Sequence, residues 1–85
     1  LHSEAIRILG ELILDAASRT QVIVATQSPL LLDQFAIENI VTMNRRDGQS
    51  TFERLQRSDY SEWLESYSVG ELWAKNVIHG GTTHE

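Results

Sequence analysis

The chain has 85 residues, of which 41% are hydrophobic, and its seven Lys and Arg against twelve Asp and Glu give a formal net charge of −5. Such a chain is too apolar to be disordered and lacks the basic face of a free-standing nucleic-acid binder. It has no cysteine, which excludes disulfides and thiolate metal sites, and no apolar run near the roughly 20 residues that span a bilayer. Because the first residues also lack the basic and apolar regions of a signal peptide, we expect a cytoplasmic protein without a membrane partner.

The first predicted element is a helix from about Glu4 to Ser18. Ser3 is suited to cap its first turn, and Arg19 places a cation near its end. Its apolar residues recur at helical spacing: Ile6, Leu9, Leu12, Ile13 and Ala16. This spacing predicts a helix with one apolar face.

The next segment, Gln21–Thr26, is a continuous run of mostly β-branched apolar residues. Continuous rather than alternating hydrophobicity is typical of a strand buried on both faces of a parallel sheet. Such a strand needs a neighbour on each side, and this chain supplies at most one other strand near it. We therefore expect the rest of the sheet to lie in a longer parent protein, in agreement with a chain that begins at Leu1 rather than at a methionine.

A second helix is predicted to begin at Ser28-Pro29, because Ser caps a helix and Pro fits its first position, and to run to about Phe35. Two further strands follow at Asn39–Arg45 and Ser50–Leu55. The pair Asp47-Gly48 lies between them and accepts positive φ at little cost. This pattern predicts an antiparallel hairpin.

Two helices close the predicted order. Ser58 caps the first, which has large side chains on one face: Tyr60, Trp63, Leu64 and Tyr67. Ser68–Glu71 matches a capping box and begins the second, which includes Trp73. An aromatic stripe at helical spacing is more often core than a partner surface, so we expect Trp63, Tyr67 and Trp73 in the core. The tail from Asn76 is expected to be disordered.

The predicted order is α-β-α-β-β-α-α, which describes an α/β protein and the C-terminal part of a larger sheet. We divide the chain into residues 1–36 with the first helix, the buried strand and the following turn, and residues 37–57 with the hairpin. Residues 58–79 hold the C-terminal helices, and residues 80–85 form a tail.

A polar triplet, Thr26-Gln27-Ser28, directly follows the predicted buried strand. Ligands bind at the carboxyl ends of the strands in open α/β sheets, so the triplet stands where a nucleotide would lie. From spacing alone, an ordinary strand-to-helix turn with a Ser-Pro cap is the commoner interpretation. Asp33, shortly afterwards, could cap or pair locally.

These residues resemble the end of an ABC-type ATPase domain, in particular the RecF/SMC-like group of bacterial predicted ATPases of the AAA class. The resemblance rests on Leu1-His2, on QVIVATQSPLLLD at 21–33, and on RDGQSTF, EWLE and GELWAKN further along, and it extends to about Gly81. The switch segment of that family usually reads Thr-His-Ser-Pro, so Gln27 takes the place of its His. Ser3 takes the place of a common Pro.

The resemblance implies the fold of a P-loop NTPase of the ABC type. In such a domain Thr26, Gln27 and Ser28 would contact the nucleotide, Gln27 would act at the switch position beside the γ-phosphate, and Leu1 and His2 would lie at a dimer interface. ATP and Mg²⁺ would be bound mainly by an N-terminal part that this chain lacks. The implied partners are the rest of the same ATPase domain and a second copy joined through ATP, with nucleic acid contacted only through the parent protein.

The chain lacks the parts that hydrolysis needs. It has no G-x-x-x-x-G-K-[ST] run and no paired acidic residues after a hydrophobic strand, so we expect no ATP hydrolysis by this chain alone. No metal site is predicted, because His79 and His84 lie in the expected loose tail. Two alternatives stay open: a free-standing acidic protein-interaction module without catalysis, and a different nucleotide-handling α/β enzyme divided at the same point.

Overall fold

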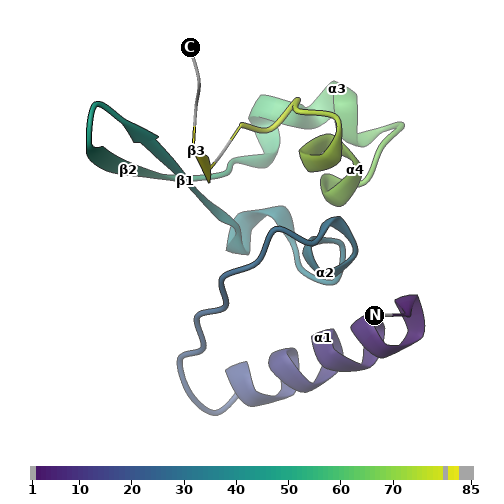
Figure 1. The fold of residues 1–85 in the computed structure, drawn as a ribbon. Coiled ribbons are helices and arrows are strands. Elements are labelled where there is room, and N and C mark those ends of the chain that lie inside the picture. The colour runs from purple at the N-terminus through teal and green to yellow at the C-terminus, as the bar shows by residue number, and fades with distance from the viewer. Residues whose placement is uncertain (1, 80, 83–85) are drawn as a thin grey trace.

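The computed structural model describes residues 2–79 and 81–82 (Figure 1). The structure is a small α/β domain, as predicted, and no helix among these residues is long and apolar enough to cross a membrane. In chain order its elements are helix α1 (Ser3–Ala17), helix α2 (Pro29–Leu32), the 3₁₀ turn η1 (Ile37–Asn39), strand β1 (Val41–Arg46), strand β2 (Gln49–Arg54), the 3₁₀ turn η2 (Arg57–Tyr60), helix α3 (Ser61–Leu64), helix α4 (Val69–Ala74) and strand β3 (Gly81–Thr82).

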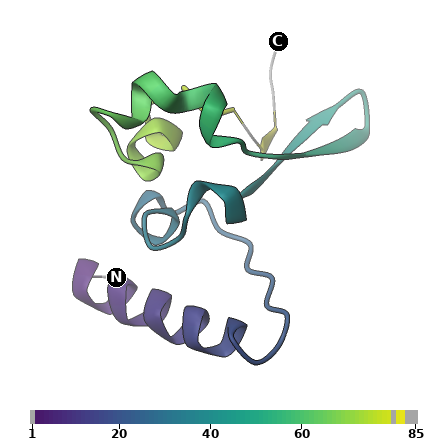
Figure 2. The same cartoon turned by 180° about the vertical axis from the view of Figure 1, so that it is seen from behind.

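Helix α1 lies at one end of the molecule and contacts α2 (Figures 1 and 2). Its buried face is narrow, because only Ile6 and Gly10 along it are buried, and a Cβ on Gly10 would lie 2.6 Å from the Cβ of Gln34. The predicted cap is wrong by one residue: His2 occupies the N-cap position, and its side chain makes no cap hydrogen bond. Of the predicted apolar face, Ile6 is buried and Ile13 and Ala16 are half-buried, whereas Leu9 and Leu12 are exposed. Ile8 and Leu14, outside that face, are exposed as well.

The predicted buried strand Gln21–Thr26 is not formed. This segment is an extended connection between α1 and α2 that pairs with no strand in the described part of the chain (Figure 1). Ile23 is 87% exposed and Val24 is exposed as well. A strand forms only where a neighbouring strand receives its backbone hydrogen bonds, and the sheet in this structure lies around β1 instead. The predicted first α-β-α therefore becomes α1 followed directly by α2.

The hairpin is confirmed, with strand ends shifted by one to two residues from the prediction. Strands β1 and β2 pair antiparallel from Val41↔Arg54 to Arg46↔Gln49. Asp47 and Gly48 both have positive φ, 54° and 77°, which is the backbone of a two-residue hairpin turn whose twist suits the strands. Strand β3 adds a short parallel pairing on the other edge of β1, and the sheet order is β2-β1-β3.

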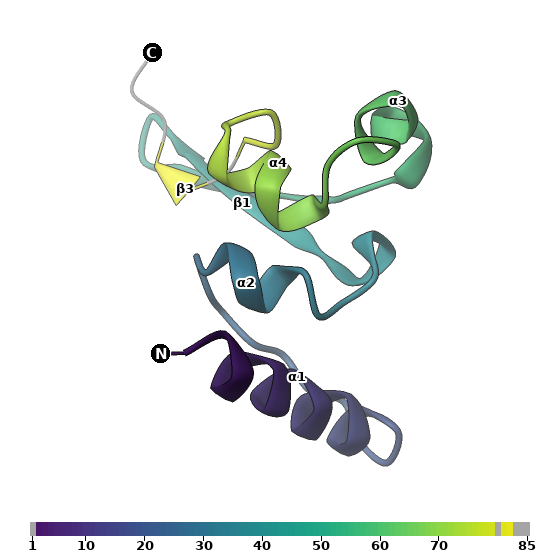
Figure 3. The same cartoon turned by 90° about the vertical axis from the view of Figure 1, so that its right-hand side faces the viewer.

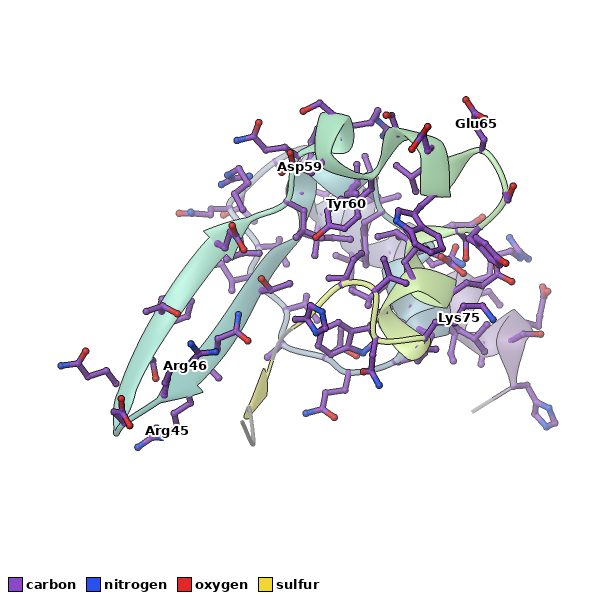
Figure 4. All side chains as sticks on the ribbon, turned by 90° about the horizontal axis from the view of Figure 1, so that it is seen from above. Arg45, Arg46, Asp59, Tyr60, Glu65 and Lys75 are labelled. Atoms are coloured by element: carbon purple, nitrogen blue, oxygen red, sulfur yellow. The ribbon has the colours of Figure 1, made fainter. Side chains whose placement is uncertain are left out.

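The hairpin contributes few buried side chains. Thr42 is buried and donates from its hydroxyl to the carbonyl of Glu53 at 3.4 Å, whereas the directly opposed Met43 and Phe52 are exposed on the other face. Figure 4 shows the far end of the hairpin, with Arg45 and Arg46, projecting well away from the helices.

The core lies between the base of the hairpin and helix α4. Its buried members come from η1, the end of the hairpin, α4 and the segment after α4: Ile37, Leu55, Val69, Leu72 and Ile78. Leu72 is 0% exposed and Ile78 is 2% exposed. Helix α2 lies between α1 on one side and α4 on the other, and it contacts both (Figure 3). Helix α4 and α2 thus form the centre of the molecule.

The expectation of a disordered tail from Asn76 is wrong for residues 76–79. Asn76 has a φ of 63°, and the amides of Asn76 and Val77 donate to the carbonyls of Trp73 and Leu72 at 3.2 and 2.9 Å. These two bonds after a left-handed residue make a Schellman helix end, which turns the chain back so that Ile78 enters the core. Of the predicted tail at 80–85, residues 81–82 form β3, and the others lie outside the described residues.

The expectation that Trp63, Tyr67 and Trp73 lie in the core is confirmed for Trp73, which packs against the buried cluster, and wrong for the other two. Tyr60 packs against the same cluster. Trp63 and Tyr67 are exposed instead, with their rings 6.0 Å apart at 46°. Helix α3 is only four residues long, so it has no continuous face with which to bury both rings.

Candidate functional site

The predicted triplet forms a polar turn, Thr26–Pro29, at the start of helix α2. The Thr26 hydroxyl oxygen accepts the backbone N–H of Ser28 at 3.0 Å. The Ser28 hydroxyl oxygen accepts the backbone N–H of Leu31 at 3.2 Å, which caps α2 with Pro29 in its first turn. The predicted Ser-Pro cap is confirmed. Because both hydroxyls are used here as acceptors, each keeps its own O–H to donate to a ligand.

Gln27 lies at the outer point of this turn. Its side chain is exposed, whereas Thr26 and Ser28 are half-buried. Its backbone carbonyl accepts the indole N–H of Trp73 at 3.1 Å, across 46 positions of sequence. The turn therefore fixes the main chain of Gln27 and leaves its amide side chain directed to the surroundings.

Helix α4 is joined to α2 just behind this turn. The Asp33 carboxylate accepts the backbone N–H of Gly70 at 2.6 Å with one oxygen and the hydroxyl of Ser68 at 3.0 Å with the other. A Cβ on Gly70 would lie only 2.1 Å from the carbonyl oxygen of Pro29. The two helices approach so closely that position 70 must be glycine.

The predicted capping box at the start of α4 is confirmed. The Glu71 backbone N–H donates to the Ser68 hydroxyl oxygen at 3.1 Å, and the Ser68 backbone N–H donates to the Glu71 carboxylate at 2.8 Å. The local pairing suggested for Asp33 is wrong: its carboxylate bonds Ser68 and Gly70, which lie 35 and 37 positions away. Sequence reasoning missed Trp73 as a partner of the polar turn, since no short-range pattern connects the two.

The positions predicted for a dimer interface are not brought to the polar turn by any hydrogen bond in the described chain. His2 is exposed at the beginning of α1, where its carbonyl oxygen accepts the amide of Ile6 at 3.1 Å. Leu1 lies outside the described residues. The dimer-interface role of these two residues stays a prediction.

The polar turn has donors but no charge of its own. The bonds that build it involve hydroxyl, amide and indole groups only. Three neutral donors from Thr26, Gln27 and Ser28 can contact a phosphate oxygen, yet a neutral donor makes a weaker bond to an anion than a charged one. Among the described residues there is also no group of three His, Cys, Asp or Glu side chains that could hold a metal ion.

A shallow hollow of about 340 Å³ lies on the side of Asp33 and α4, and it includes Arg57 and Ser68. Both charged groups that line it are already paired. Asp33 holds α4, and Arg57 donates two bonds to the Glu38 carboxylate at 2.7 and 3.0 Å. Those bonds lower the pKa of Glu38 and raise the pKa of Arg57. The hollow therefore offers an incoming ligand no unpaired charge of either sign.

Comparison of the chain with protein-family models, with curated proteins and with solved structures found no match. The structure by itself defines a small α/β domain that presents a polar turn at the start of a helix. The P-loop NTPase fold and the ATPase function remain what the sequence resemblance implies.

Proposed function

We propose that the chain is the C-terminal subdomain of an ATP-binding and ATP-hydrolysing ABC-type ATPase, and that it is inactive alone. It would contribute the polar turn as the switch segment, with Gln27 beside the γ-phosphate, together with a dimer-interface region that includes Leu1 and His2. The observation that carries the proposal is the presentation of Gln27. Trp73 holds its carbonyl and the bond between Thr26 and Ser28 closes the turn around it, while its side-chain amide stays exposed.

The segment before the polar turn supports the proposal that the rest of the sheet lies in another part of the ATPase. Ile23 and Val24 are exposed β-branched residues in an extended connection, and they cover no part of the described core. Exposed apolar surface on an extended, unpaired segment is a template for pairing with further strands. In the proposal those strands belong to the rest of the same ATPase domain, so the polar turn would stand at the carboxyl edge of its sheet.

The hydrogen-bond donors of the polar turn suit an additional contact to ATP rather than the main ATP-binding site. The Gln27 amide and the hydroxyls of Thr26 and Ser28 would hold phosphate oxygens, and none of them supplies positive charge. Mg²⁺, when bound, neutralises phosphate charge, and together with most of the nucleotide it would be held by the part of the ATPase that carries the phosphate-binding loop. Hydrolysis would then depend on how this turn positions Gln27 against an anion that other residues bind.

The test compares steady-state ATPase rate and ATP-induced dimerisation in the ATPase that contains this chain. Gln27→Ala should lower both, and Gln27→His should preserve or raise turnover, because imidazolium is a charged donor. The matched control is Gln56→Ala, which removes an exposed amide that makes no side-chain cap bond. If Gln27→Ala equals wild type in both assays, the switch role is wrong and Thr26–Pro29 is only a helix cap.

A second candidate function is a free-standing acidic protein-interaction module. The observation in its favour is the exposed apolar face of the hairpin, where Val41, Met43 and Phe52 point to one side. The two functions differ in a simple way. The module would tolerate Gln27→Ala without loss and would lose its partner on Phe52→Ser, whereas the ATPase subdomain predicts a loss of turnover on Gln27→Ala.

A further inference from the structure

The polar turn is anchored from helix α4 rather than from a strand. On its N-terminal side the connection 21–25 forms no strand pairing in the described chain. On its C-terminal side Ser28 and Pro29 belong to the cap of α2. From helix α4, the Trp73 indole donates a bond of 3.1 Å to the Gln27 carbonyl.

Trp73 is well placed to act as an anchor because its own position is fixed. It lies in α4, which contributes Val69 and Leu72 to the buried core, and its ring packs against that cluster. The Schellman end of α4 begins with the amide of Asn76 donating to the Trp73 carbonyl at 3.2 Å. Swinging the indole away from Gln27 would therefore disturb packing as well as break one hydrogen bond.

Helices α2 and α4 also behave as one unit at this point. Asp33 near the end of α2 bonds the first turn of α4, and Gly70 leaves no gap against the Pro29 carbonyl. A displacement of α4 would break these bonds and pull on the Gln27 peptide through Trp73. Interiors this closely packed shift between discrete arrangements rather than deforming continuously.

We propose that Trp73 is a positioning residue for the polar turn, so that a nucleotide contacted by Gln27 and the state of helix α4 are energetically coupled. This inference rests on the proposed function. The Trp73–Gln27 bond holds the Gln27 peptide so that its side-chain amide is preorganised toward the phosphate. By linkage, a nucleotide that needs this orientation strengthens the bond, and loss of the bond weakens the productive contact by the same factor.

The first measurement asks whether the bond exists without nucleotide. In the ¹⁵N-labelled chain, the two indole N–H resonances are assigned with the Trp63→Phe variant. Their hydrogen-exchange rates are then compared. The Trp73 indole should exchange several-fold more slowly than that of the exposed Trp63. Equal exchange rates would overturn the anchoring of the turn whatever the chain does with ATP.

The second measurement asks whether the bond is coupled to nucleotide in the ATPase that contains this chain. Trp73→Phe keeps an aromatic ring, smaller than the indole, and removes the donor; Trp63→Phe makes the same change at an exposed position and is the control. We expect Trp73→Phe to lower kcat about five-fold, the worth of one net hydrogen bond, with KM for ATP within about two-fold, because most of the nucleotide is bound elsewhere. Addition of Mg·ATPγS should shift the Trp73 indole resonance and leave that of Trp63 in place.

The outcomes separate the two proposals. If the wild-type ATPase binds and turns over ATP while Trp73→Phe matches it and the Trp73 resonance does not respond, the coupling is wrong and the switch role of Gln27 survives. If Trp73→Phe matches Gln27→Ala in its loss of turnover and the double variant adds nothing, the coupling is supported. If the wild type binds no ATP, the proposed function and the coupling both fail, and the anchoring is decided by indole exchange alone.

Discussion

Replacing Gly70 with alanine should destabilise the domain, although alanine is the better helix former. A Cβ at position 70 lies 2.1 Å from the carbonyl oxygen of Pro29 and 2.7 Å from Oδ1 of Asp33. The Pro29 atom belongs to the backbone and cannot rotate away. Helix α4 must therefore move off α2 and weaken the bond of 2.6 Å between the Gly70 amide and Asp33.

The magnitude follows from three opposing contributions. Alanine gains about 1 kcal/mol of helix propensity. Against this, overpacking costs about 1–3 kcal/mol and the loss of a hydrogen bond to a charged carboxylate costs about 1.5–3 kcal/mol. The net loss in the free energy of unfolding is then about 1.5–5 kcal/mol, which is comparable in size with the roughly 3–5 kcal/mol that a small core supplies.

The assay is urea unfolding of the chain, followed by tryptophan fluorescence. Ser61→Ala, at an exposed position of α3, is the control and should change the free energy of unfolding by less than about 0.5 kcal/mol. Gly70→Ala should cost less in an Asp33→Ala background, because the bond is already lost there. A Gly70→Ala chain as stable as wild type, or more stable, would refute the close approach of α2 and α4.

Three further predictions concern pH, the exposed segment and the hairpin turn. The hydrogen bonds from Arg57 hold the pKa of Glu38 below its ordinary value of 4.5, so their stabilisation is present above pH 4.5 and is lost as pH falls through the lowered pKa. Glu38→Gln should therefore reduce the loss of unfolding free energy at acid pH, and an unchanged loss would count against the Glu38–Arg57 pair. Ile23→Thr should change the free energy of unfolding of this chain by less than about 0.5 kcal/mol relative to wild type, because Ile23 is 87% exposed. The same variant should bind the separately expressed rest of the ATPase more weakly in a pull-down, and equal binding would argue against a covering sheet. Gly48→Ala should cost about 1 kcal/mol in thermal unfolding, because alanine resists the φ of 77° at that position, and a neutral result would contradict the hairpin turn.

The elements that the sequence predicted correctly depend on short-range chemistry. The turn at Asp47-Gly48, the cap by Ser28 and the capping box at Ser68–Glu71 each involve residues within four positions of one another, and all are present. The prediction of a strand at Gln21–Thr26 is wrong because a strand needs paired neighbours, and a local sequence pattern does not show whether they are present. The end of α4 differs from the prediction for another reason. Asn76 adopts the left-handed region and ends the helix as glycine would, whereas the sequence pattern alone predicts a loose tail from this residue.

The sequence indicated the residues of the polar turn but not the contact that holds it in place. Thr26, Gln27 and Ser28 could be selected because they follow an apolar run and precede Pro29. Trp73 could not, because its bond to Gln27 spans 46 positions and depends on how α4 packs against α2. Long-range contacts of this kind arise from the tertiary packing and leave no periodic trace in one sequence.

If Gln27 lies beside the γ-phosphate of ATP, a photoreactive group on that phosphate should react with the polar turn. ATP carrying an azidoanilide on its γ-phosphate is bound to the ATPase that contains this chain, irradiated, and the product is digested with trypsin. Cleavage after Arg19 and Arg45 isolates the peptide 20–45, which holds the whole polar turn. We expect a label on this peptide within Thr26–Ser28, and its loss when unmodified ATP competes. Labelling confined to other parts of the ATPase, with residues 20–45 unmodified, would contradict it.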